Sequence, residues 1–105
     1  GADGVIAVVS NEAPALLVAL VEAALTGERD EGARLQAKLF PLMRANFRES
    51  NPIPVKWALH RLGLIQDVLR LPLVPLSKGL HKPMEEALRE AGLLDEAGNP
   101  VGEDA

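Results

Sequence analysis

The sequence contains no cysteine and no tyrosine, and its only aromatic residues are one tryptophan and two phenylalanines. Without cysteine the chain forms neither disulfides nor thiolate metal sites, which fits a reducing cytoplasm. Because aromatic rings are so few, leucine, alanine and valine must fill any core, and this composition favours helices.

Long apolar runs and blocks of like charge are also missing. The longest apolar stretch, residues 13–25, is interrupted by Pro14 and Glu22 and is too short to span a bilayer. The N-terminus has no basic segment of the kind that opens a signal peptide. A net charge of −4 and a pI near 5.1 argue against nucleic acid, which binds basic surfaces. We therefore expect a cytoplasmic protein with neither nucleic acid nor a membrane as partner.

Residues 5–9 (VIAVV) predict a buried β-strand. The run is rich in β-branched residues and apolar on both faces, which is typical of a parallel sheet covered by helices. No comparable strand follows, so its backbone groups have no ladder partner. Leaving four such side chains in water would forfeit on the order of 6–12 kcal/mol. We therefore expect the rest of the sheet to come from preceding residues of the natural polypeptide or from another chain.

The rest of the chain predicts helices separated by glycine and proline. Apolar residues recur at helical spacing in four segments, residues 14–26, 30–47, 54–62 and 82–91. Pro41 predicts a kink or a break in the second of them. Residues 66–76 contain two prolines and predict an irregular segment laid across another surface. Ser77 is a predicted N-cap, and the polar residues 95–105 are predicted to be flexible.

Residues 51–59 (NPIPVKWAL) predict a rigid elbow followed by an anchored helix. Two prolines one residue apart stiffen the approach, and Pro54 suits the first helical position. Gly63 is predicted to end the helix with a left-handed conformation. Because Trp57 is the only tryptophan, we expect this helix to dock on an apolar surface. Lys56 beside it is either a desolvated nucleophile or a lysine whose stem covers apolar surface. We favour the second reading, since this position offers no partner base.

Other side chains that could carry chemistry have simpler interpretations. His60 and His81 are too far apart for a helical pair of metal ligands, so we expect surface or capping roles. Adjacent carboxylates near helix starts favour the helix dipole and predict solvated faces; they are Glu28, Asp30, Glu31, Glu85 and Glu86. Ser10 and Asn11 follow the predicted strand, and in barrels this end of a strand faces the active site. Asn11 as a cap of the next helix is an equal alternative.

Residues 51–59, followed by residues 61–64 (RLGL) and 69–76 (LRLPLVPL), resemble the C-terminal portion of dihydrodipicolinate synthase. Residues 1–6 (GADGVI) resemble this family's turn into its eighth barrel strand, and residues 10–14 (SNEAP) the helix start that follows. The similarity runs from Gly1 to Leu94. It implies a (β/α)8 TIM barrel in the whole protein, of which this chain is the last strand plus a mainly α-helical C-terminal region.

The resemblance also implies a domain organisation and a function. Residues 1–28 would be the last β/α unit, residues 29–94 the helical region and residues 95–105 a flexible tail. The family is a pyruvate-dependent Schiff-base lyase that condenses pyruvate with aspartate semialdehyde in lysine biosynthesis, typically as a homotetramer and without a cofactor or metal. This segment is expected to close the barrel and brace it.

The resemblance places one binding residue in this chain and no catalytic residue. Ile6 matches the isoleucine whose main chain contacts pyruvate. The family's Schiff-base lysine, its proton-relaying tyrosine and its carboxylate-binding threonines belong to earlier strands, so this segment alone is expected to be inactive. Lys56 is not that lysine, because it lies in the elbow helix. Ser50 replaces a frequent proline, and Glu12 replaces a residue that is usually apolar.

Two alternatives stay open at this point. Neuraminate and sugar-acid lyases share the barrel and the first step, although they generally lack the phrase in residues 51–57 (NPIPVKW). A non-enzymatic helical module could instead associate through the surface that a barrel would cover.

Overall fold

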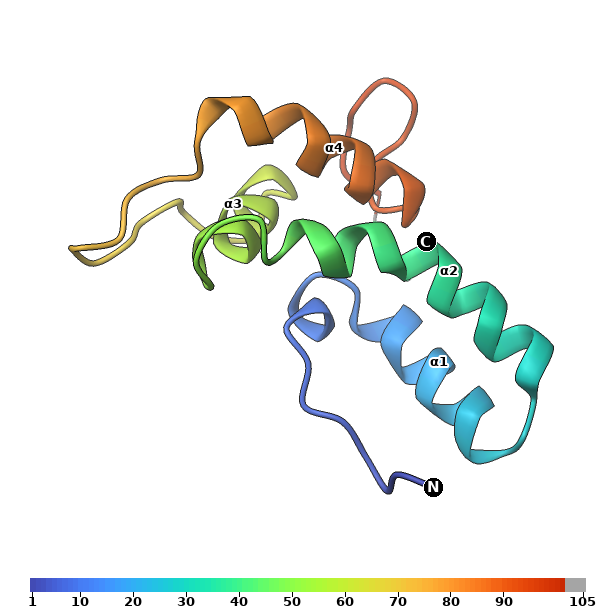
Figure 1. Ribbon diagram of the computed structural model, residues 1–105. Helices are drawn as coiled ribbons and strands as arrows, with labels where there is room; N and C mark the ends of the chain where they lie inside the picture. Colours follow the sequence, from blue (N-terminus) through green and yellow to red (C-terminus); the bar gives the residue numbers. More distant parts are fainter. Residues whose placement is uncertain (102–105) are drawn as a thin grey trace.

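The computed structural model describes residues 1–101, and its regular elements are almost entirely helical (Figure 1). The elements are η1 (Val9–Asn11), α1 (Pro14–Leu25), α2 (Arg29–Ala45), α3 (Ile53–Arg61), η2 (Lys78–Leu80) and α4 (His81–Glu90). The four predicted helices are therefore confirmed to within one or two residues at most ends. An isolated antiparallel bridge joins Leu94 to Pro100.

The prediction of a β-strand at residues 5–9 is wrong for this structure. Within residues 1–101 no segment forms a strand; residues 5–8 are irregular, and Val9 already belongs to η1. The side chain of Ile6 is fully exposed and that of Val5 is 61% exposed. The physical reason is that a strand needs a neighbouring strand to pair its N–H and C=O groups, and the described residues provide none.

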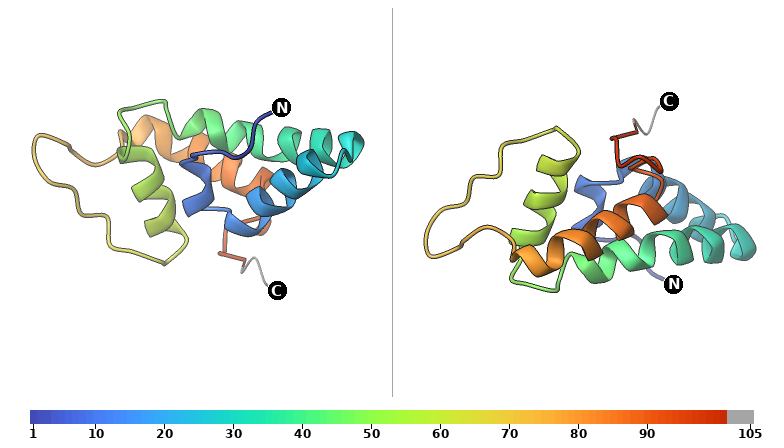
Figure 2. Two further views of the ribbon diagram at one scale, coloured as in Figure 1. Left: turned by 90° about the horizontal axis from the view of Figure 1, so that it is seen from below. Right: turned by 90° about the horizontal axis from the view of Figure 1, so that it is seen from above.

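Helix α2 lies at the centre of the fold. Figures 1 and 2 show α1 running along one side of it and α4 along the other. Leu39 and Leu42 of α2 and Leu88 of α4 are completely buried, so aliphatic side chains fill the core as the composition predicted. The helix continues through Pro41, which rules out the predicted alternative of a break.

The elbow before α3 anchors this helix in the core. The Asn51–Pro52 peptide is cis, and α3 begins at Ile53, so that Pro54 lies in its first turn. Trp57 is only 8% exposed and stacks on His81, with ring centroids 4.6 Å apart and planes inclined by 18°. The prediction that Trp57 docks its helix on an apolar surface is therefore confirmed.

Gly63 ends α3 in the way its sequence position predicted. Its φ is 79°, a left-handed conformation that glycine adopts without steric strain. The Gly63 N–H donates to the carbonyl of His60 at 2.9 Å, and the Leu64 N–H donates to the carbonyl of Leu59 at 3.0 Å. These two bonds form a Schellman motif, which satisfies carbonyls at the helix end.

Residues 64–76 form an extended arm that projects away from the helices in all three views (Figures 1 and 2). Its root is tied to α3, because the Lys56 ammonium donates to the Val68 carbonyl at 2.9 Å. Leu64, Val68 and Leu71 are more than half exposed, whereas Leu69 and Leu73 are partly buried and pack against the core. The predicted contact with another surface therefore holds for part of this arm. Leu76 at the end of the arm returns to the core and is 4% exposed.

Ser77 occupies the N-cap position of η2, but its side chain does not cap the helix. Its hydroxyl donates instead to Glu49 Oε2 at 2.5 Å, and its N–H donates to Glu49 Oε1 at 2.9 Å. These two bonds stabilise the carboxylate and hold the pKa of Glu49 below its ordinary value. The predicted capping hydrogen bond is wrong because this carboxylate takes the hydroxyl.

Residues 95–101 form a hydrogen-bonded turn after α4. The Asp95 N–H donates to the Asn99 carbonyl at 2.9 Å, the Asn99 N–H donates to Asp95 Oδ1 at 2.8 Å, and the Val101 N–H donates to the Leu93 carbonyl at 2.8 Å. Residues 102–105 lie outside the described residues, and the flexible tail stays a prediction.

Candidate functional site

An apolar cleft of about 520 Å³ lies between the N-terminal segment, α1 and α2. Residues 5–9 form one wall, and the other walls come mainly from Leu17, Leu20, Val21, Met43 and Phe47. The only polar side chains among its described lining residues are those of Gln36 and Asn46. An open cleft of this composition exposes apolar area that water does not solvate favourably, and such areas mark interaction surfaces.

Ile6, the one residue predicted to contact a substrate, lies at this cleft. Its side chain is fully exposed, and it belongs to the irregular segment before η1. The main chain around Ile6 has no strand partner within the described residues. The structure therefore places the candidate binding segment at the surface, beside the apolar cleft.

Ser10 and Asn11 both bond back to the segment that carries Ile6. The Ser10 hydroxyl donates to the carbonyl of Ala7 at 2.8 Å, and the Asn11 amide donates to the carbonyl of Val8 at 2.9 Å. The N-cap of α1 is Ala13, which makes no side-chain capping bond. The interpretation of Asn11 as a cap of this helix is therefore wrong, and both side chains serve to close the turn.

A buried carboxyl–amide pair joins this turn to the end of α2. Glu12 is 3% exposed and Asn46 is completely buried. The Asn46 amide donates to Glu12 Oε1 at 2.6 Å, whereas Glu12 Oε2 and Asn46 Oδ1 are buried without a hydrogen-bond partner. Burial disfavours the charged carboxylate and raises the pKa of Glu12 to about 8, although the bond from Asn46 opposes the shift.

Sequence reasoning did not select Glu12 and Asn46 as functional candidates. The available signal was a single carboxylate between the apolar run of residues 5–9 and the apolar stretch of residues 13–21. Asn46 gave no signal, because an asparagine just after a helix is ordinarily solvated. Only the packing of η1 against α2 shows that the two side chains meet, 34 positions apart in the sequence.

Lys56 and the two histidines have structural partners. Besides the bond from Lys56 to the Val68 carbonyl, the His60 Nδ1 lies 3.2 Å from the Ile65 carbonyl, and His81 Nε2 lies 3.1 Å from the Leu76 carbonyl. The contacts of Lys56 and His60 fit the structural roles predicted for them, whereas His81 is partly buried against Trp57 and not a surface residue. Within residues 1–101 no three His, Cys, Asp or Glu side chains are grouped so that they could hold a metal ion.

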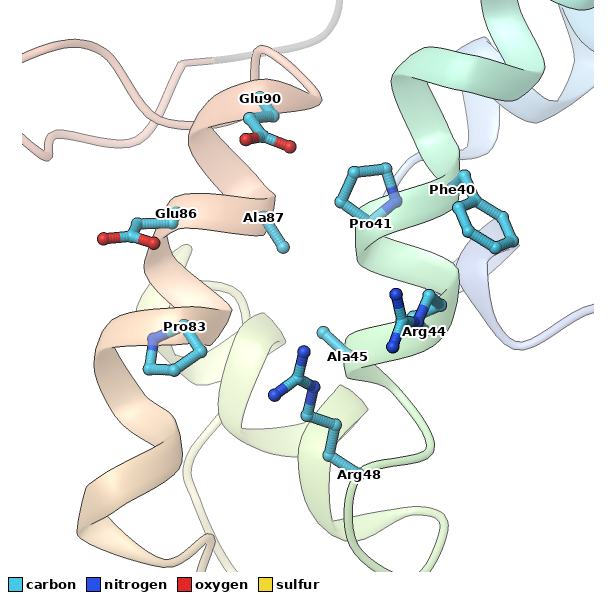
Figure 3. A pocket seen from close by; sticks show the side chains of 9 residues that line it. All are labelled: Phe40, Pro41, Arg44, Ala45, Arg48, Pro83, Glu86, Ala87 and Glu90. Atoms are coloured by element: carbon cyan, nitrogen blue, oxygen red, sulfur yellow. The ribbon is translucent and has the colours of Figure 1, made fainter.

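A second, smaller groove of about 220 Å³ separates α2 from α4 (Figure 3). Arg44 and Arg48 line one side, and Glu86 and Glu90 line the facing side. All four side chains are exposed, and among the described residues no ion pair joins the arginines to the glutamates. Exposed charges of both signs on an open groove are typical of a solvated surface, so we do not assign the site to this groove.

The carboxylates near helix starts also have structural roles. Asp30 and Glu31 lie in the first turn of α2, as predicted. Glu31 pairs with Arg34 at 2.6 Å on an exposed face. Glu85 pairs with Arg61 at 3.0 Å between α4 and α3, where both side chains are largely buried, so the predicted solvated face is wrong for Glu85. No helix within the described part of the chain has the length and apolar character needed to cross a bilayer.

Comparison with known families decides what this arrangement belongs to. The family model described as "Dihydrodipicolinate synthetase family" matches residues 1–91, which contain the cleft, the elbow and all of α4. The chain belongs to the dihydrodipicolinate synthetase family. The resemblance seen in residues 51–59 is thereby confirmed.

Members of this family also match the chain closely in sequence. The 4-hydroxy-tetrahydrodipicolinate synthases of Marinobacter nauticus and Alcanivorax borkumensis are each 50% identical to it, over 94 and 95 residues. The matches cover 90% of this chain but only 32% of each relative. The chain thus spans about a third of the length of the curated relatives that it matches.

Solved members of the dihydrodipicolinate synthetase family share the fold of this third. The enzyme from Thermotoga maritima superposes with a TM-score of 0.85 at 48% identity, over 90% of this chain and 32% of that one. The chloride-inhibited enzyme from Acinetobacter baumannii, solved in complex with pyruvate, gives a TM-score of 0.85 at 42% identity and the same coverage. These relatives are TIM barrels, whereas the described part of this chain is helical and without strands.

Proposed function

We propose that this chain acts as the C-terminal part of a Schiff-base lyase that condenses pyruvate with aspartate semialdehyde in lysine biosynthesis. The observation that carries the proposal is the open apolar cleft beside residues 5–9, in a chain whose family match spans a third of its relatives. A (β/α)8 barrel supplied by the remaining two thirds would cover this cleft and pair the backbone of residues 5–9 as its last strand.

In this proposal residues 1–28 form the last β/α unit, and residues 29–94 brace the barrel. The main chain of Ile6 contacts pyruvate, as the family resemblance implies for this position. The reacting amine belongs to the remaining part of the barrel, and Lys56 takes no part in the reaction. This assignment agrees with the hydrogen bond of Lys56 to the Val68 carbonyl, on the outer side of α3. The whole protein is proposed to be a homotetramer, which sedimentation of the chimera described next would test.

A chimeric barrel tests the proposal. Residues 1–94 of this chain replace the matching third of the Marinobacter nauticus relative, with which they share 50% identity. The chimera is expected to consume pyruvate and aspartate semialdehyde, and borohydride is expected to trap pyruvate on a lysine of the relative's portion. The unmodified relative is the positive control, and its first two thirds alone are the negative control. A folded but inactive chimera, or a pyruvate adduct on Lys56, contradicts the proposal.

Substitution of Ile6 in the same chimera tests the binding assignment. Because the proposed contact comes from the main chain, Ile6→Val is expected to leave the KM for pyruvate within about twofold of its original value. Ile6→Pro restrains φ and removes the backbone N–H, and it is expected to raise this KM by about tenfold or more. An unchanged KM in Ile6→Pro would contradict the main-chain contact, and an equally large rise in Ile6→Val would assign the contact to the side chain.

A further inference from the structure

If Glu12 is an ionised carboxylate, the buried pair of Glu12 and Asn46 leaves polar atoms without hydrogen bonds. One hydrogen bond joins them, from the Asn46 amide to Glu12 Oε1 at 2.6 Å. The two atoms left over, Glu12 Oε2 and Asn46 Oδ1, are both buried acceptors without a donor. An unpartnered acceptor in a dry interior carries a free-energy penalty, and here two of them belong to residues that already touch.

One proton satisfies both acceptors. A protonated carboxyl group has one O–H donor and one free carbonyl oxygen, and a primary amide has the complementary donor and acceptor. We propose that Glu12 is a neutral acid in the folded protein, that it donates to Asn46 Oδ1, and that this acid–amide clamp is a positioning element for the segment that carries Ile6. The positioning part of this inference rests on the proposed function of Ile6.

The location of the clamp explains what it positions. Glu12 directly follows η1, a turn closed by hydrogen bonds from the Asn11 N–H to the Val8 carbonyl at 3.0 Å and from the Ala13 N–H to the Val9 carbonyl at 2.9 Å. Asn46 directly follows the last turn of α2. The clamp therefore fixes the turn after Ile6 to the central helix, from inside the fold.

Within residues 1–101, no charged group forms a hydrogen bond or an ion pair with Glu12. The elements packed against η1 are α1, α2 and α3. Their charged residues include Glu22 of α1, Arg44 of α2, and Lys56 and Arg61 of α3. Lys56 is bonded to the Val68 carbonyl, and Arg61 is bonded to Glu85 and to the Gly98 carbonyl. Burial and the bond from Asn46 are the influences on the pKa of Glu12, and the net effect is a rise to about 8.

Infrared spectroscopy tests the protonation directly. The spectrum of the wild-type protein minus that of Glu12→Gln is recorded at about pH 6 and about pH 9, on this chain and on the chimera. The expected result is a C=O band of a protonated carboxyl group at the lower pH that is replaced by carboxylate bands at the higher pH. Glu12→Gln is the matched control, because its amide forms the same two bonds to Asn46 and does not titrate.

Hydrogen exchange of the amides of Asn11, Glu12 and Ala13 tests the clamp. Between about pH 4.5 and about pH 8, exchange corrected for base catalysis is expected to rise by up to about tenfold per pH unit in the wild type, and above this range it is expected to level off. In Glu12→Gln it is expected to stay constant within about twofold. Carboxylate bands at the lower pH, or the same pH dependence in both proteins, would overturn the clamp. Asn46→Leu removes the acceptor, and its expected loss of protection at every pH gives a second readout.

The activity of the chimera tests the positioning role. Above about pH 8 the KM for pyruvate is expected to rise by about tenfold more in the wild type than in Glu12→Gln, while kcat changes alike in both. Identical KM profiles together with a titrating infrared band would overturn the positioning role and keep the clamp. A chimera without lyase activity would count against the proposed function, whereas the infrared and exchange results would still decide the clamp.

Discussion

The two sides of α2 differ in how completely they are buried. On the α4 side, Leu88 is completely buried, Met84 is 2% exposed and Trp57 is covered by His81. On the α1 side, the cleft is open, Ile6 is fully exposed and Phe47 is 63% exposed. Both sides are built from the same aliphatic residue types, so the difference lies in the available partners and not in composition.

This difference separates the self-contained part of the chain from the part that needs a partner. The elbow, α3 and α4 close around the end of α2 with apolar contacts, a ring stack and the bridging Arg61. Val5, Ile6 and the exposed face of α1 have no such cover among the described residues. Exposed apolar area of this kind is favourable only when another surface removes it from water. The relatives that the chain matches are about three times longer, and in the proposed barrel the additional residues supply that surface.

The largest expected effect is a pH dependence of the free energy of unfolding. The pKa of Glu12 is about 8 in the folded protein and near 4.5 when unfolded, so the folded state binds this proton more tightly. Protonated Glu12 contributes its full stabilisation below about pH 4.5. This contribution is lost as the pH rises through about 8, which lowers the free energy of unfolding by on the order of 5 kcal/mol in total. Urea unfolding of the wild type and of Glu12→Gln at several pH values checks this. A difference between the two that does not change with pH contradicts it.

Truncating one leucine on each side of α2 tests the difference in burial. Leu88→Ala opens a cavity in a closed core and is expected to lower the free energy of unfolding by about 3–4 kcal/mol. Leu20→Ala, at the partly exposed wall of the cleft, is expected to lower it by only about 1 kcal/mol. Chemical denaturation measures both values.

The same leucine pair in the chimera shows whether a barrel covers the cleft. There Leu20→Ala is expected to lower the free energy of unfolding by about 2–3 kcal/mol, because its side chain is then buried. Leu88→Ala is expected to have an unchanged effect. An equally small effect of Leu20→Ala in both proteins would show that no surface covers the cleft.

Two ion pairs give the smallest expected effect. Arg61 binds Glu85 at 3.0 Å with both side chains about two-thirds buried, and it also donates to the Gly98 carbonyl. Arg61→Ala is therefore expected to lower the free energy of unfolding by about 1–2 kcal/mol. Arg34→Ala is the matched control on an exposed face of α2, where no measurable change is expected. Equal thermal shifts for the two variants would contradict this ranking.

The sequence predicted well those features that depend on neighbouring residues. Apolar spacing located all four helices, and Gly63 and Pro54 marked the ends of α3 because their backbone preferences act locally. The predicted capping hydrogen bond of Ser77 was wrong, because its hydroxyl donates to a carboxylate 28 positions away. The Glu12–Asn46 pair escaped prediction for the same reason: a long-range contact decides whether a polar side chain is solvated or buried.

The amino-acid sequence by itself determined the helices, their glycine ends, the docking of Trp57 and the family. It also determined that residues 5–9 are too apolar for water, but not what they pair with. Only the tertiary structure decided that Val5 and Ile6 are uncovered here, that Val9 is buried, and that η1 meets α2 through a buried acid and amide. Propensity and periodicity act within a few residues, whereas strand pairing and the ionisation of a buried carboxyl depend on groups brought together by folding.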